Sequence, residues 1–92
     1  SRRFFAFTQS YDDLQGHGTI IIAAITSVSK KCRKFPTHYH LNDRCGLMKP
    51  SVVMLEQIRT IDKSRLKNYI GHLNKDDMEN INKTLLCSLG IT

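Results

Sequence analysis

SVVMLEQIRTIDKSRL, residues 51–66, begins as an apolar stretch and then turns abruptly polar. Residues 51–57 alternate as a β-strand, and residues 58–61 continue the strand pattern after what we interpret as a β-bulge. Such a polar end is rare in a strand that serves only a hydrophobic core. Its polar side chains are those of Glu56, Gln57, Arg59, Thr60 and Asp62.

Three further strands are indicated upstream. Residues 3–9 and 19–26 are rich in Phe, Ile and Thr, and the stretch between them contains Gly16 and Gly18. This pattern predicts two antiparallel strands joined by a flexible loop. Residues 37–41 alternate as a third strand. Short strands separated by turn signals are typical of a small barrel.

The apolar period changes to that of a helix near the C-terminal end. We predict an amphipathic helix over residues 75–89, with Asn74 as N-cap, Asp77 at the third helical position and Gly90 just past the end. We expect its apolar stripe to pack against the sheet or a second subunit. The stripe consists of Met78, Ile81, Leu85 and Leu89.

Composition indicates one small domain with a basic surface. The chain has 92 residues, and 14 Lys and Arg against 8 Asp and Glu give a formal charge of +6. A positive charge favours a polyanionic partner, although solubility alone would also explain it. No apolar run approaches the roughly 20 residues of a membrane span. We therefore expect a cytoplasmic protein.

The cysteines do not predict a disulfide framework. Cys32, Cys45 and Cys87 are odd in number and widely spaced, so we expect reduced thiols, and no metal or other cofactor. A zinc site formed by Cys32, His38, His40 and Cys45 is a minor alternative, because His-x-His places both rings on one face of a strand. Neither of these cysteines belongs to the usual close pair.

Several motifs, taken in order, resemble the MazF/PemK family of toxin endoribonucleases, the mRNA interferases of type II toxin–antitoxin systems. LEQIRT followed by IDKSRL is a specific signal, AAIT at residues 23–26 is moderately specific, and PTH at residues 36–38 is weak. The resemblance extends from about Arg3 to Ile91. Family members begin with a strand and a glycine-rich loop ahead of the position that matches Arg3, and both are absent from this sequence.

The resemblance implies a single MazF-like domain over residues 1–92. Its fold would be mainly β with a C-terminal helix, a small SH3-like antiparallel barrel of the CcdB/PemK type that works as a homodimer. The implied activity is metal-independent cleavage of single-stranded mRNA at a short specific sequence, through attack of the ribose 2′-hydroxyl on the adjacent phosphate. A MazE-like antitoxin is the implied inhibitor.

Strand spacing pairs Arg3 with Thr26, and the resemblance implies that these two residues are catalytic. If Gln9 lies opposite Ile20, Arg3 lies opposite Thr26, and directly opposed Cβ atoms are roughly 4.5–5.5 Å apart. Arg3 would stabilise the phosphorane through its fork of donors, and Thr26 would orient the phosphate. A slip of one residue would place the two side chains on opposite faces.

We expect RNA-binding residues on either side of this pair. Glu56 and Gln57 would contact base edges, because carboxylate and amide groups can recognise unstacked bases. An ion pair of Glu56 with Arg59 or Arg65 is an equally good structural explanation.

Three residues that follow the second strand complete the predicted RNA site. Ser27 would act beside Thr26, and Lys30 and Lys31 belong to a basic run that suits flanking phosphates. A solvated loop would also explain that run.

Two other functions remain as alternatives. The first is a DNA gyrase poison like CcdB, which depends on a C-terminal Trp-Gly-Ile, whereas this sequence has Leu89-Gly90-Ile91. The second is a truncated or inactive barrel that only binds RNA. That reading gains weight if the pairing of Arg3 with Thr26 fails.

Overall fold

The computed structural model describes residues 3–8, 10–27, 35–41 and 49–91. The described residues form a four-stranded antiparallel sheet and one C-terminal α-helix, which confirms the predicted fold class. The strands are β1 (Arg3–Ala6), β2 (Thr19–Ser27), β3 (His38–Leu41) and β4 (Ser51–Asp62), and the helix is α1 (Lys75–Ser88). Two short 3-10 turns, η1 (Tyr11–Leu14) and η2 (Lys63–Arg65), follow β1 and β4.

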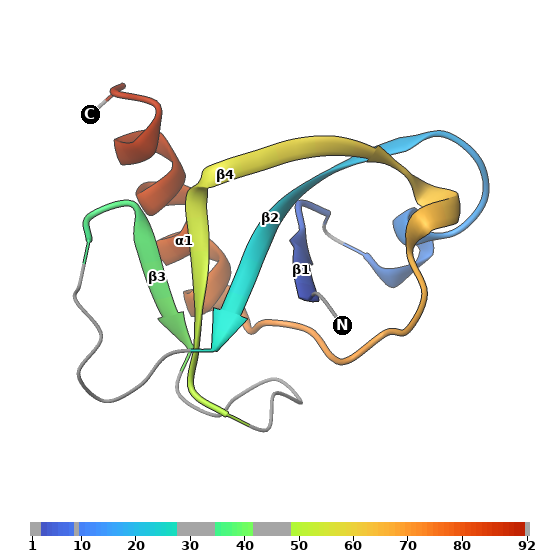
Figure 1. Ribbon diagram of the computed structural model, residues 1–92, viewed down its shortest axis with the longest axis horizontal. Helices are drawn as coiled ribbons and strands as arrows, with labels where there is room; N and C mark the ends of the chain where they lie inside the picture. Colours follow the sequence, from blue (N-terminus) through green and yellow to red (C-terminus); the bar gives the residue numbers. More distant parts are fainter. Residues whose placement is uncertain (1–2, 9, 28–34, 42–48, 92) are drawn as a thin grey trace.

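β4 is the longest strand and occupies an inner position in the sheet, whose order is β1-β2-β4-β3. Its pairing with β2 steps from Ala24 opposite Met54 to Ala23 opposite Ile58, so residues 55–57 have no partners in β2. Extra residues in one strand of a pair bend that strand. Figure 1 shows the result, a β4 that runs beside β3 and then turns to continue in another direction. The predicted bulge is therefore confirmed.

The pairing of β1 with β2 differs by one residue from our prediction. Arg3 lies opposite Ile25, and not opposite Thr26. The apolar pattern explains the difference, because the observed register places Phe5 opposite Ala23, and both are buried in the cluster beneath α1. A register shifted by one would have turned one of the two to the other face.

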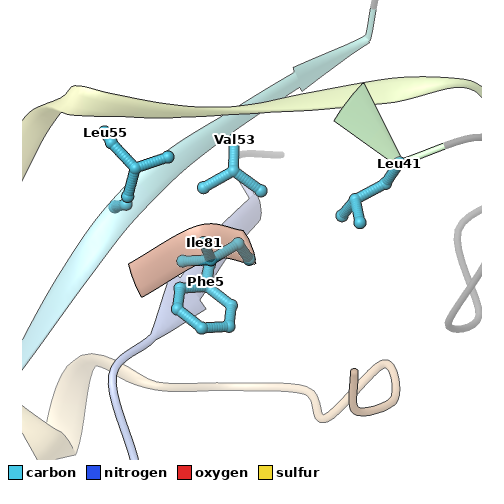
Figure 2. Close-up of a cluster of buried hydrophobic side chains, with 6 residues drawn as sticks. Phe5, Leu41, Val53, Leu55 and Ile81 are labelled. Atoms are coloured by element: carbon cyan, nitrogen blue, oxygen red, sulfur yellow. The ribbon is translucent and has the colours of Figure 1, made fainter. Parts of the chain in front are cut away.

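Two hydrophobic clusters lie on opposite faces of the sheet. We call the face that α1 covers the inner face and the other the outer face. The inner cluster contains Phe5, Ala23, Leu41, Val53, Leu55 and Ile81. Figure 2 shows Ile81 of α1 between the side chains of Phe5 and Val53, with Leu55 and Leu41 to either side in this view. The outer cluster is smaller, and contains Ile20, Ile22 and Ile61 with Phe4, Ala6, Leu14 and Leu66 packed against it.

α1 begins and ends close to the predicted positions. The Asn74 side chain accepts a hydrogen bond of 2.8 Å from the backbone N–H of Asp77, as an N-cap does. Gly90 follows the helix with φ +75°, a conformation that favours glycine at a helix end. Of the predicted apolar stripe, Ile81 is fully buried, whereas Leu89 is 54% exposed.

Polar contacts fix α1 on the inner face at both ends. The hydroxyl of Tyr39 in β3 donates to Oδ1 of Asp77, which is buried in the first turn of the helix. At the other end, the Ser88 hydroxyl donates to the carbonyl oxygen of Leu55 at 3.1 Å. Since Leu55 begins the bulge, the helix holds β4 at the point where it bends.

Candidate active site

On the outer face, strand pairing fixes where Thr26 of β2 lies relative to the two histidines of β3. Side chains alternate between the two faces of a strand, so the residues paired across one row share a face. One row runs from Phe4 through Ala24 and Met54 to His38. The next row contains Thr26 and Val52, together with His40. Thr26 therefore lies one row away from His38.

The predicted catalytic pair lies at one end of the β1–β2 ladder. Thr26 is exposed in β2 opposite Val52, and Arg3 is half-buried at the start of β1. Because Ile25 packs on the inner cluster, Arg3 leaves the sheet on the inner face, whereas Thr26 leaves it on the outer face. The structure thus brings the two residues to the same end of the sheet and separates their faces.

Glu56 lies in the bulge and forms a polar contact that the sequence did not predict. Its Oε2 is 3.0 Å from Nε2 of His38, and the contact is an ion pair when His38 is protonated. Glu56 pairs with His38, and not with Arg59 or Arg65 as the structural alternative required. His38 occurs in the PTH motif, but only the pairing of β3 with β4 reveals this partnership.

The contact with His38 changes the acidity of Glu56. Partial burial raises the pKa of the carboxyl, but the hydrogen bond from His38, a backbone hydrogen bond and attraction to His38 outweigh it. The pKa therefore lies below its ordinary value of 4.5. At neutral pH the Glu56 carboxylate is ionised, so it accepts hydrogen bonds only.

Of the other predicted RNA-binding residues, Gln57 and Ser27 lie in the part of the chain that the structure describes. Gln57 is exposed in the bulge beside Glu56, and Ser27 is exposed at the end of β2, opposite Ser51. Lys30 and Lys31 lie outside the described residues.

Neither a metal cluster nor a membrane helix is found in the described part of the chain. No three His, Cys, Asp or Glu side chains there could hold a metal ion. Cys32 and Cys45, which the zinc alternative requires, lie outside it. No helix among these residues is long and apolar enough to cross a membrane.

The fold is that of solved MazF toxins. The structure matches the Mycobacterium tuberculosis toxin MazF-mt6 with a TM-score of 0.81 and 21% identity, covering 99% of this chain and 88% of that chain. It also matches a mycobacterial endoribonuclease in complex with its cognate antitoxin, with a TM-score of 0.74, 20% identity and coverage of 97% and 81%.

Sequence comparison defines the family. The chain belongs to the PemK-like, MazF-like toxins of type II toxin–antitoxin systems, whose family model matches residues 9–89. It is 45% identical over 74 residues to the endoribonuclease EndoA of Bacillus subtilis, an overlap of 79% of this chain. The matched segments are 63% and 61% of the lengths of two curated relatives, so the chain spans about three-fifths of each. The predicted family is confirmed.

The lowered pKa of Glu56 predicts a pH dependence of stability. In the folded state the carboxyl binds its proton less readily than in the unfolded state, so its contribution is fully present above pH 4.5 and is lost as the pH falls through the lowered value. Glu56→Gln should remove at most about 1 kcal/mol at neutral pH, because the Glu56 side chain is exposed to solvent, and nothing in strong acid. Denaturant unfolding of the wild-type protein and of Glu56→Gln, at neutral pH and in strong acid, measures the difference in unfolding free energy.

Glu79→Gln is the matched control for this experiment, since Glu79 is an exposed carboxylate on α1. Its effect on the unfolding free energy should be near zero at both pH values. Equal pH dependence in the wild-type protein and in Glu56→Gln would contradict the role of the contact with His38.

Proposed function

We propose that this protein is a toxin endoribonuclease that cleaves single-stranded mRNA at a short specific sequence in the cytoplasm. The observation that carries the proposal is the 45% identity to a curated endoribonuclease over most of this chain. Membership of the PemK-like, MazF-like family supports it. The gyrase-poison alternative is not favoured, because the matching family model is that of PemK-like, MazF-like toxins. Gly90, one of the two residues that this alternative could use, is accounted for as the residue that ends α1.

The proposed reaction is attack of a ribose 2′-hydroxyl on the adjacent phosphate, which leaves a cyclic phosphate and a free 5′-hydroxyl. The protein must stabilise the negative charge of a phosphorane and manage two protons. A guanidinium supplies a planar, permanently charged fork of donors for phosphate oxygens. Its ordinary pKa of about 12.5–13.8 makes it a poor base near pH 7, so stabilisation of the transition state is the better role.

We assign that role to Arg3, with Thr26 orienting the phosphate from the outer face. The observed register separates the faces of the two residues, which gives weight to the alternative of a barrel that only binds RNA, but both residues lie at the same end of the β1–β2 ladder. A long arginine stem can carry its charged head away from its own backbone position. The proposal therefore requires that the Arg3 side chain passes around the strand end toward Thr26.

Recognition of the RNA sequence is assigned to the bulge of β4. Glu56 is ionised and accepts hydrogen bonds only, which suits the exocyclic amino groups of unstacked bases. Gln57 both donates and accepts, so it could contact several base edges. Ser27 would act beside Thr26, and Lys30 and Lys31 would hold the flanking phosphates, as predicted from the sequence.

We further propose a homodimer and a MazE-like antitoxin as partners. The family is that of toxins from type II toxin–antitoxin systems, which supports the antitoxin. Exposed apolar side chains support the dimer, and three of them follow one another closely at the end of α1: Leu86 is 38% exposed, Leu89 54% and Ile91 67%. The alternative dimer surface, residues 51–57, is less suitable because Val52, Val53 and Leu55 are already buried within one chain.

Purified protein should cleave single-stranded RNA in the presence of EDTA, because the proposed chemistry uses the 2′-hydroxyl and no metal. Gel analysis of the products should show ends with a cyclic phosphate and a 5′-hydroxyl, and an antitoxin that binds the protein should suppress cleavage. Activity that EDTA abolishes and zinc or magnesium restores would reject metal-independent cleavage.

Arg3→Ala should lower the single-turnover cleavage rate by roughly two to three orders of magnitude, with a much smaller loss of RNA affinity, because the lost interaction strengthens in the transition state. Arg3→Lys should recover part of the rate, since an ammonium keeps the charge without the fork. Thr26→Val, which preserves shape, should also slow cleavage. Lys83→Ala on the exposed side of α1 is the control and should cleave normally. A wild-type rate in Arg3→Ala would remove Arg3 from the site.

Sedimentation at micromolar concentration should show a dimer, because a domain of this size gains stability from burying further apolar surface. Leu86→Glu combined with Leu89→Glu should yield a folded monomer, since both side chains are exposed in a single chain. A stable wild-type monomer would reject the dimer, and a dimer that survives the double substitution would reject this surface.

A further inference from the structure

Arg59 makes a contact that neither the fold nor the proposed chemistry requires. It lies in β4 just beyond the bulge, opposite Ile22, and its side chain is exposed on the outer face. The central carbon of its guanidinium lies 5.6 Å from the centroid of the Phe4 ring in β1. A cation at this distance from an aromatic ring is attracted by the negative face of the ring.

Phe4 is a firm support for this contact. Its ring packs against the outer cluster of Ile20, Ile22 and Ile61, so it is anchored in the sheet. Contact with an anchored ring restricts the Arg59 side chain before any ligand arrives. Restriction in advance lowers the entropy that a side chain loses on binding.

The charge of Arg59 is not neutralised within the described part of the chain. The salt bridge found among those residues joins His38 to Glu56 and does not include Arg59. The ring contact forms no hydrogen bond with the N–H groups of the guanidinium, so these donors are left for a ligand. A restricted, exposed guanidinium without a carboxylate partner is suited to a phosphate group.

We propose that Arg59, positioned by Phe4, binds a backbone phosphate of the RNA strand whose base Glu56 contacts. This inference rests on the proposed function and adds a phosphate-binding residue to the same site. Phe4 acts as a positioning residue, because it touches Arg59 and not the RNA.

The neighbouring Glu56 favours RNA over an acidic peptide as the ligand. Glu56 precedes Arg59 by three positions in β4, and both side chains are exposed on the same strand. A nucleotide offers a phosphate to the guanidinium and amino donors on its base to the carboxylate. An acidic peptide offers carboxylates, which Glu56 would repel.

Binding is measured with a single-stranded 2′-O-methyl oligonucleotide of mixed sequence, which lacks the attacking hydroxyl and cannot be cleaved. Arg59→Ala should weaken binding roughly tenfold or more at low salt, as expected for a lost charge-assisted contact. The slope of log K against log[salt] should become shallower by about 0.7, the value for one phosphate on a single strand. Arg59→Lys should keep the slope and lose part of the affinity.

Phe4→Leu tests the positioning role, because leucine keeps the packing on the outer cluster and removes the ring. It should weaken binding roughly two- to fivefold without changing the salt slope. In an Arg59→Ala background the same substitution should have no further effect. Circular dichroism checks that each variant is folded, and Lys83→Ala on α1 is the charge-matched control that should bind like the wild-type protein.

The outcomes separate this inference from the proposed function. If the wild-type protein cleaves RNA and Arg59→Ala binds with the wild-type affinity and slope, the phosphate site is wrong and the proposed function stands. If Arg59→Ala loses affinity for poly-glutamate but not for the oligonucleotide, Arg59 serves an acidic protein partner and the inference is overturned. If the wild-type protein neither binds nor cleaves RNA, both fail.

Discussion

The bend in β4 is the constraint on which both the core and the site depend. Residues 55–57 have no partners in β2, because Ala24 pairs with Met54 and its neighbour Ala23 pairs with Ile58. The Leu55 side chain packs with Ile81 in the inner cluster. Its backbone N–H donates to the carbonyl oxygen of Thr37 at 2.9 Å, and its carbonyl oxygen accepts from the Ser88 hydroxyl. The next two side chains, Glu56 and Gln57, are exposed. One irregularity thus fixes the helix and presents the polar groups.

Local features of this fold could be predicted from the sequence because their causes are local. The change from apolar to polar residues at Glu56 is the sequence signature of the bulge. The cap at Asn74 and the end of α1 at Gly90 follow from side-chain and backbone preferences within one turn. The family resemblance rested on motifs that lie in these same segments, which is why the fold class was correct.

The contacts between strands could not be predicted from the sequence in the same way. The long connection between β1 and β2 does not fix their register, and the buried pairing of Phe5 with Ala23 does. The partnership of His38 with Glu56 needs β3 and β4 side by side, and no spacing in the sequence specifies it. The sequence suggests Arg59 only as an ion-pair partner of Glu56, because the Phe4 ring that it contacts belongs to a distant strand, β1.

These corrections change how the proposed site would act on RNA. Arg3 leaves the sheet on the inner face and would have to pass around the strand end, whereas Thr26 and Arg59 lie on the outer face, where the ionised Glu56 carboxylate contacts His38. A uniformly basic face would attract any polyanion, since phosphate contacts carry no sequence information. In the proposed site, a carboxylate and a cation on the same strand would disfavour bare anions and favour a ligand that carries both a phosphate and an amino group. Discrimination among nucleic-acid sequences by the proposed site would therefore rest on the acidic residue, whereas the net charge of +6 would favour the encounter with any polyanion.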